Sequence, residues 1–221
     1  MTELTLDLGG EQRGVTIDTA IVAGWTARDK EALEHHMAEL EALGVARPSA
    51  APIFYRVSAA RLTTVGEIEA TEASSGEAEA VLLQVEGVLW VGIGSDHTDR
   101  EVEAFGVAVS KQMCEKPIGA SFWPYEEVAG HWDELRLRSW ITEDGGEVLY
   151  QDGTLAAMLP PGDLIAAATP SVEDGTLMFC GTLAAIGGIR PAATFRYELN
   201  DPILDRRLEA NYSMRTLPLI S

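Results

Sequence analysis

Hydrophobic and polar residues alternate along much of the chain, which is typical of strands that bury one face. Leucines alternate with polar residues over 4–8, and a second apolar alternation follows over 15–19 after a pair of glycines, which predicts a hairpin. Further strands are predicted over 53–57, 68–70, 78–85, 88–93, 135–141, 147–150, 177–179 and 193–199. Glycine-containing turns such as Glu86-Gly87 separate several of them.

One segment has the period of a helix instead. Over 29–43, apolar side chains recur every three or four residues, Asp29 is a suitable N-cap, and Gly44 follows the end. Shorter helices are predicted near 101–112, 125–131 and 160–167. No repeated βαβ pattern with a glycine-rich phosphate loop is present, so the fold class is α+β, mostly β, with antiparallel strands dominant.

The amino-acid composition and net charge limit the kinds of molecule that the protein can bind. The chain has 221 residues, 46% of them hydrophobic, which suits one domain with a sizeable core. Its formal net charge is −19, so its surface repels phosphate backbones and anionic lipids, and no nucleic-acid or membrane partner is expected. No apolar run approaches about 18 residues. The N-terminus is acidic and alternating, unlike a signal peptide, which makes the cytoplasm the expected compartment.

Two glutamates at the start of a predicted strand are the first candidate for chemistry. Glu77 and Glu79 are two residues apart, so in a strand they share one face, and that face continues with apolar residues. Buried carboxylates side by side repel each other and need a positive partner. The alternative is an exposed strand end at which both glutamates are solvated.

A second polar cluster follows the next predicted strand directly. Asp96, Asp99 and Arg100 lie within five residues, where loops after buried strands often hold ligands. The alternative is that Ser95 or Asp96 caps a helix beginning near Arg100. His97 could be a ligand or a packed loop histidine, and the second interpretation is favoured.

The third cluster lies on the predicted helix. His36 borders the apolar stripe, whereas His35 points nearly opposite, and Glu39 is one turn after His36. A carboxylate in contact with an imidazole orients the ring and raises its basicity, as a general base requires. The alternative is an incidental contact on a surface helix.

The three clusters resemble motifs of the fumarylacetoacetate hydrolase (FAH) superfamily, in the same order. That family has an H-x-x-E lid helix, a P-x-x-F-x-K segment, E-x-E, D-x-[ST]-x-R and then a lysine. The corresponding segments here are His36-Met37-Ala38-Glu39, Pro52-Ile53-Phe54-Tyr55-Arg56, Glu77-Ala78-Glu79, Asp96-His97-Thr98-Asp99-Arg100 and Ser110-Lys111. Two later segments, Gln151-Asp152-Gly153-Thr154 and Phe179-Cys180-Gly181-Thr182, resemble its Q-x-G-x-T and T-G-T-P segments.

The chain departs from the family pattern at several points. Arg56 replaces a lysine, and Leu183 replaces the proline of T-G-T-P. The interval from Glu79 to Asp96 is shorter than usual, which a tight hairpin at Glu86-Gly87 would accommodate.

The resemblance implies an FAH-like mixed β-sandwich or β-roll with a short lid helix, forming one catalytic domain over 1–221. Within that domain, 1–23 would be N-terminal strands, 29–43 the lid helix and 52–200 the β-rich core.

The resemblance also implies a divalent metal, Mg²⁺ with Mn²⁺ or Ca²⁺ as alternatives, held by Glu77, Glu79 and Asp96. A hard cation of this kind would neutralise the carboxylate pair. The catalytic residues would be His36 and Glu39, which match the dyad that activates water, and Lys111, which matches a lysine that stabilises developing negative charge. The expected substrate-binding residues are Arg56, Arg100, Gln151 and Thr182.

The expected function is a metal-dependent hydrolase or lyase that cleaves a C–C bond in a small oxo-acid, of the acylpyruvate or 1,3-dicarbonyl type. An isomerase, hydratase or decarboxylase of an unsaturated oxo-acid on the same metal site is the alternative within enzymes. A non-catalytic protein that binds small acids is the alternative from another class. Fold and metal do not select among these activities.

We predict that the protein is a homodimer, because FAH proteins commonly pair through their strand-rich core and because one small domain leaves apolar strands to cover. Light scattering at micromolar concentration should give twice the mass of 23.8 kDa. A monomer mass over the whole concentration range would contradict this prediction.

Overall fold

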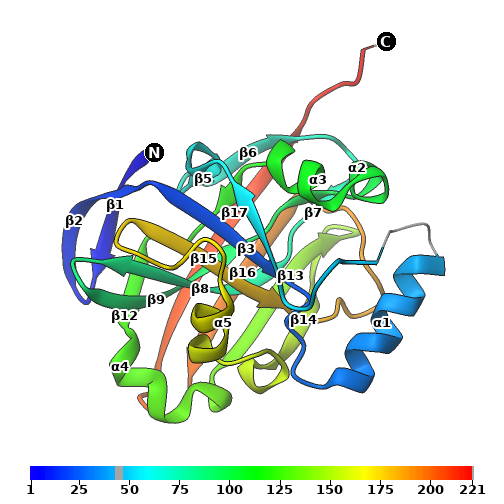
Figure 1. Ribbon diagram of the computed structural model, residues 1–221. Coiled ribbons are helices and arrows are strands. Elements are labelled where there is room, and N and C mark those ends of the chain that lie inside the picture. Colours follow the sequence, from blue (N-terminus) through cyan, green and yellow to red (C-terminus); the bar gives the residue numbers. More distant parts are fainter. Residues whose placement is uncertain (43–46, 221) are drawn as a thin grey trace.

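Two larger sheets form most of the computed structural model, which describes residues 1–42 and 47–220 (Figure 1). The first is an eight-stranded mixed sheet in the order β2-β1-β12-β9-β8-β15-β3-β4. Its strands are β1 (Thr2–Leu8), β2 (Glu11–Ile17), β3 (Thr19–Gly24), β4 (Ile53–Val57), β8 (Ala78–Val85), β9 (Val88–Ser95), β12 (Ser121–Pro124) and β15 (Thr176–Thr182).

The second sheet has five strands in the order β14-β13-β16-β17-β6. They are β6 (Glu67–Ala70), β13 (Arg136–Glu143), β14 (Gly146–Thr154), β16 (Thr194–Asp201) and β17 (Arg206–Thr216). Two short pairs complete the strands: β5 (Leu62–Thr63) with β11 (Lys116–Pro117), and β7 (Ser74–Ser75) with β10 (Thr98–Asp99).

The main hydrophobic core lies between the two larger sheets. Alternate residues of β8, such as Ala80 and Leu82, pack there with Tyr197 and Tyr212 of the second sheet. The other face of the eight-stranded sheet curls over a second cluster that includes Val81 of β8. Strand β8 is therefore buried on both faces, which explains its continuous apolar sequence.

The β8–β9 hairpin sets the register on which the polar clusters depend. Its two turn residues, Glu86 and Gly87, have positive φ angles of 52° and 75°, as the tight turns of two-residue hairpins require. Ala78 pairs with Ser95 at the far end, and the Asp96 N–H donates to the Glu77 carbonyl oxygen over 3.0 Å. The E-x-E segment and the start of the second cluster are therefore neighbours in space.

Helices surround the sheets. They are α1 (Lys30–Ala42), α2 (Arg100–Phe105), α3 (Val107–Met113), α4 (Tyr125–Val128) and α5 (Pro161–Ala167), with short 3₁₀ turns η1 (Ala59–Arg61), η2 (Ala129–Glu134) and η3 (Leu155–Ala157). Helix α1 lies at one side of the molecule (Figure 1). The Asp29 carboxylate caps it by accepting from the Glu31 N–H over 2.9 Å, as predicted.

The predicted class, α+β and mostly β, is confirmed. Predicted strands 53–57 and 78–85 match β4 and β8, because apolar runs bounded by turn residues define them clearly. The predicted helix 101–112 is divided into α2 and α3 at Gly106. The longest strand, β17, was not predicted, because charged and polar residues fill its exposed positions and obscure the buried Leu208 and Tyr212.

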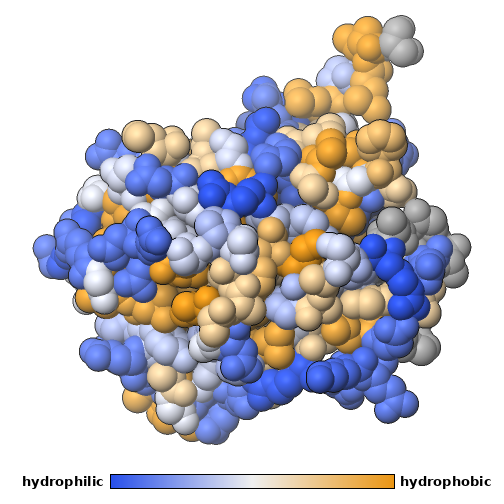
Figure 2. Space-filling view, viewed as in Figure 1, coloured by the Kyte–Doolittle hydropathy of each residue, from blue (hydrophilic) through white to orange (hydrophobic). Residues whose placement is uncertain are grey.

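The C-terminal segment extends away from the body of the molecule with apolar side chains in solvent (Figure 2). Leu217, Leu219 and Ile220 are exposed there. In the described part of the chain, no helix is long and apolar enough to cross a membrane.

Candidate metal centre and active site

Three carboxylates from the β8–β9 hairpin converge at one point. Glu77 precedes β8, Glu79 lies on β8 and Asp96 follows β9. Each offers one oxygen, and these oxygens lie within 4.8 Å of one another. The hairpin register produces this arrangement, since it places the Asp96 backbone against that of Glu77. The alternative of an exposed strand end with both glutamates solvated does not hold, because Glu79 is buried and Glu77 is largely covered.

Asp96 lies between two buried lysines. Lys111 of α3 donates to its Oδ2, and Lys116 Nζ of β11 lies 2.9 Å from its Oδ1. Burial alone would raise the pKa of Asp96, but the charges of Lys111 and Lys116 outweigh burial and lower it. Conversely, burial alone would lower the pKa of Lys111, but Asp96 and Glu77 raise it, so this lysine stays charged.

Glu79 has a different environment. Its Oε2 accepts from the Gly181 N–H over 2.6 Å, and among the described residues no Lys, Arg or His nitrogen lies within ion-pair distance of it. Burial and the charges of Asp96 and Glu77 raise its pKa well above the usual range. Glu79 is therefore the carboxylate that most needs a further positive charge.

Gly181 can occupy this position only because it has no side chain. Its φ is +98°, and a Cβ there would lie 1.8 Å from Thr26 Oγ1. The glycine of the T-G-T-P-like segment thus brings its N–H to Glu79 while Thr26 packs against its Cα.

Glu77 faces the guanidinium of Arg100 from α2. Arg100 Nη2 lies 3.3 Å from Glu77 Oε1, while its Nη1 bonds Glu103 over 2.8 Å and its Nε bonds Ser75 over 2.7 Å. Although burial opposes the charge of Arg100, Glu77 and Glu103 raise its pKa. Arg100 therefore stays cationic at the edge of the site.

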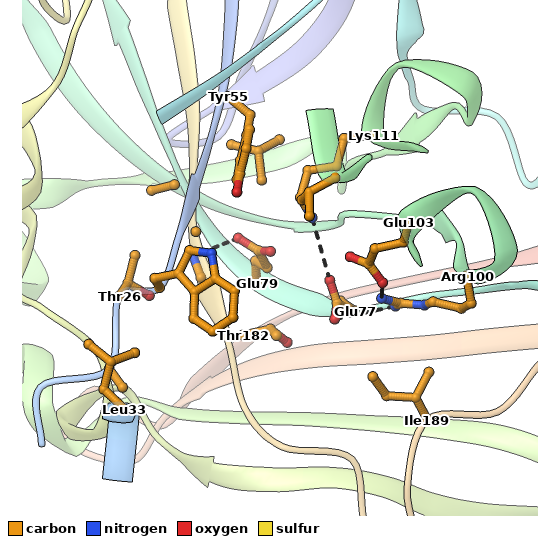
Figure 3. Close-up of a pocket in the computed structure, with 17 residues that line it drawn as sticks. Thr26, Leu33, Tyr55, Glu77, Glu79, Arg100, Glu103, Lys111, Thr182 and Ile189 are labelled. Carbon is orange, nitrogen blue, oxygen red and sulfur yellow. Dashed lines mark hydrogen bonds and ion pairs between the residues drawn. The ribbon is translucent and has the colours of Figure 1, made fainter. Parts of the chain in front are cut away.

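Five of these charged residues line a cavity of about 180 Å³, namely Glu77, Glu79, Arg100, Glu103 and Lys111. Asp96 and Lys116 are fully buried and do not line it. Figure 3 shows the side chains of Glu77, Glu79 and Lys111 directed toward one another, with Tyr55 and Leu33 on other sides. Leu33 belongs to the first turns of α1, so this helix borders the cavity.

Gln151 and Thr182 connect the start of β8 to the end of β15 through hydrogen bonds. The Gln151 Oε1 accepts from the Ala78 N–H (2.9 Å) and from Ser139 (2.7 Å), and its Nε2 donates to Thr182 (2.7 Å) and to the Leu183 carbonyl (2.7 Å). Thr182 in turn donates to the Ala78 carbonyl over 2.8 Å. Thr182 lines the cavity, and the substrate-binding role expected of both residues stays a prediction.

Arg56 lies outside the cavity. It is exposed on β4, while its neighbour Tyr55 lines the cavity. Successive strand residues point to opposite faces, so both cannot reach the site. The expectation that Arg56 binds substrate does not fit this placement.

The structure does not describe the side chains of the predicted dyad, His36 and Glu39. The backbone of α1 is described through Ala42, but the side chains of His36, Glu39 and His35 are not. Their predicted roles remain predictions.

His97 and the cap of α2 resolve two alternatives. His97 is buried, its two ring nitrogens lie 2.8 Å from Tyr212 and Ser74, and burial with the charge of Lys116 lowers its pKa to about 3. It is a packed loop histidine, as favoured. Helix α2 is capped by Asp99, not by Ser95 or Asp96 as the alternative held.

Sequence reasoning missed Lys116, Tyr55 and Glu103 as members of the site. Lys116 enters through a two-residue parallel pairing of β11 with β5, which has no sequence pattern of its own. Tyr55 could have been found, because alternation along the predicted strand makes it or Arg56 face inward, but not both.

Comparisons with known proteins identify the family of the chain and confirm its fold. Residues 23–212 match the family model described as "Protein of unknown function (DUF2848)". The chain belongs to the DUF2848 family. No curated protein matches it.

Solved structures with a similar fold include proteins described as fumarylacetoacetate hydrolase family members. A candidate fumarylacetoacetate isomerase/hydrolase from Oleispira antarctica is 18% identical with a TM-score of 0.71, over 96% of this chain and 100% of that one. A candidate fumarylpyruvate hydrolase from Burkholderia cenocepacia is 18% identical with a TM-score of 0.66, over 99% and 97%. A 2-keto-3-deoxy-D-arabinonate dehydratase is 16% identical with a TM-score of 0.61, over 93% and 76%. The predicted FAH-like fold is confirmed.

The donor set of the site fits a hard divalent cation. Carboxylate oxygens are the ligands that Mg²⁺ prefers, and each carboxylate has about four lone-pair positions, so Asp96 retains capacity beside its two lysines. The described charged groups are four carboxylates, counting Glu103, and three cations. A divalent ion would satisfy Glu79 and leave the site slightly positive, which suits an anionic substrate.

The buried pair of Asp96 and Lys116 should stabilise the fold strongly. Lys116→Met should lower the free energy of unfolding by roughly 3 kcal/mol, because it leaves Asp96 buried with one cation fewer. Urea denaturation without added metal measures this loss.

The matched control is Arg136→Met, which breaks an ion pair with Asp152 that is 2.7 Å long but exposed. Solvent screens such pairs, so this variant should unfold close to the wild-type midpoint. Equal losses of unfolding free energy in the two variants would contradict the stabilising role of the Asp96–Lys116 pair.

Proposed function

We propose that the protein is a metal-dependent enzyme that cleaves a C–C bond in a small oxo-acid of the acylpyruvate or 1,3-dicarbonyl type. One observation carries this proposal: Glu77, Glu79 and the buried Lys111 line a cavity on an FAH-superfamily fold, and the carboxylate of Asp96 lies next to them. Burying several carboxylates and an ammonium group costs free energy of folding. Such clusters are typical of functional sites, and a bound cation together with an anionic substrate would use these charges.

Glu77, Glu79 and Asp96 would hold the metal, with Mg²⁺ preferred and Mn²⁺ or Ca²⁺ as alternatives. When bound, such an ion supplies Lewis-acid stabilisation of the negative charge that develops on an oxo-acid. The residues of the chain then have separate tasks. Lys111 donates to the developing oxyanion, and Arg100 attracts the substrate carboxylate to the edge of the site.

His36 is the proposed base that takes a proton from the attacking water, and Glu39 is proposed to orient its ring. Support comes from the start of α1, where Leu33 lines the cavity. Position 36 is three residues further along the helix, on the same face, whereas position 35 is turned away.

The main alternative is a hydratase, isomerase or decarboxylase that uses the same carboxylates. The similar fold of a dehydratase keeps this alternative open. A protein that only binds small acids is less favoured, because it has no need of an H-x-x-E pair. Product analysis separates these activities. Hydrolytic cleavage yields two carbon fragments without CO₂, decarboxylation releases CO₂, hydration adds the mass of water, isomerisation conserves mass, and binding alone yields no product.

A homodimer is part of the proposal. Exposed apolar side chains on the C-terminal segment and on α2–α3, such as Leu219, Phe105 and Val109, are surface that a second protomer would cover.

Metal binding is the first test. Calorimetric titration of chelator-treated protein with Mg²⁺ or Mn²⁺ should show one site. Glu79→Gln should weaken that binding by at least about tenfold, because it removes a ligand charge, and outer-shell changes alone cost that much.

Glu101→Gln is the matched control, since Glu101 is exposed on α2 next to the site and faces none of the three carboxylates. It should bind the ion like wild type. If Glu79→Gln binds it equally well, the metal site is misassigned.

The dyad is the second test. With an acylpyruvate substrate, His36→Ala should lower kcat by about 10²–10⁴, the usual contribution of a general base, while metal affinity stays near wild type. Glu39→Gln should lower kcat less, because Glu39 orients the ring without transferring the proton. His35→Ala is the control and should stay close to wild type. Equal losses from His35→Ala and His36→Ala would show that the helix acts through packing alone.

A further inference from the structure

A second and larger cavity adjoins the carboxylate site. Its volume is about 900 Å³, within the range of roughly 300–1,000 Å³ that is typical of small-molecule sites. Five residues line both cavities, namely Ala27, Leu33, Glu77, Thr182 and Ile189. The two cavities are therefore compartments of one site, and Glu77 and Thr182 stand at the junction.

The wall of the second compartment is mainly apolar. Leu33 comes from α1, Met158 follows η3, and Leu183 and Ile189 belong to the segment after β15. Small alanines at 156–157 and 184–185 supply much of the remaining wall and leave its volume open.

The polar side chains in this wall are already bonded within the protein. Arg28 is the one cation among the described residues that line it, and its guanidinium forms two hydrogen bonds with Asp133 (2.7 and 2.8 Å) and one with the Met158 carbonyl (3.1 Å). All four hydrogen bonds of the Gln151 amide lie within the fold. The Tyr150 hydroxyl accepts from the Arg190 N–H.

A second carboxylate at the far end of a substrate would therefore meet apolar side chains and an arginine already neutralised by Asp133. Burying a carboxylate there without a cation costs several kcal/mol, whereas burying an alkyl chain or an aromatic ring is favourable.

We propose that the second compartment receives an uncharged apolar tail, so the substrate is an oxo-acid carrying an alkyl or aryl group rather than a dicarboxylic one. This inference rests on the proposed function, because the oxo-acid head must lie at the carboxylate site for the tail to reach the compartment. Leu33, Leu183 and Ile189 then determine the preference for the tail, while Glu77, Glu79 and Asp96 serve the head.

Binding can test this without turnover, since simple 2-oxo acids lack the bond that would be cleaved. In Mg²⁺ buffer, calorimetry should give dissociation constants that fall from 2-oxobutanoate through 2-oxohexanoate to 2-oxooctanoate. The expected gain is about fourfold per methylene, which corresponds to about 0.8 kcal/mol. The dicarboxylate of equal length, 2-oxooctanedioate, should bind at least about tenfold more weakly than 2-oxooctanoate. Affinity that is independent of length, or tighter binding of the dicarboxylate, would overturn the inference.

A charge introduced into the wall should reverse this preference. Ala184→Arg places a guanidinium at the compartment, where it should shift the ratio of the two eight-carbon affinities at least about tenfold toward 2-oxooctanedioate. Ala193→Arg is the matched control, since Ala193 is exposed on the same connection but does not line the compartment. It should keep the wild-type ratio. An unchanged ratio in Ala184→Arg, with wild-type thermal unfolding, would count against the compartment.

The outcomes separate this inference from the function on which it rests. If affinity rises with tail length but no acylpyruvate is cleaved, the apolar compartment stands and the proposed hydrolase does not. If acylpyruvates are cleaved and neither the rate nor the affinity depends on tail length, the proposed hydrolase function is supported and the proposed role of the second compartment is overturned. Absence of binding by every 2-oxo acid overturns both.

Discussion

Repulsion among three carboxylates, two of them buried and one partly covered, is the constraint on which the rest of this structure depends. Glu77, Glu79 and Asp96 approach one another within 4.8 Å where little water is available to screen them. Such a cluster persists only if positive charge surrounds it. Lys111 and Lys116 supply that charge for Asp96, and Arg100 supplies it for Glu77. Glu79 receives a backbone N–H, which leaves its demand for positive charge only partly met.

This electrostatic requirement also organises the chain that follows β9. Arg100, Lys111 and Lys116 come from three successive elements, α2, α3 and β11, and each is directed back to the hairpin that carries the carboxylates. The segment from 100 to 117 is thus held by ion pairs as well as by the backbone pairing of β11 with β5. Removing a cation would therefore disturb the fold and the site together, which distinguishes Lys116 from a surface lysine.

Sequence patterns predicted those parts of the molecule whose geometry is local. The hairpin turn at Glu86-Gly87 and the strands beside it follow from adjacent residues, and they alone bring the E-x-E segment to Asp96. Lys116 could not be predicted, because its position depends on a parallel pairing with a distant strand. The choice of Arg56 over Tyr55 failed for another reason: resemblance to a motif suggested the residue, whereas strand alternation decides which side chain faces inward.

The site separates into two parts built by different elements. The carboxylates and their cations come from the β8–β9 hairpin and the segment after it, and they allow little change, because each charge depends on the others. The apolar compartment comes from the start of α1, from η3 and from the connection after β15, whose alanines and Leu183 carry no such mutual dependence. Substitutions there can alter the shape of the tail compartment without disturbing the charged cluster.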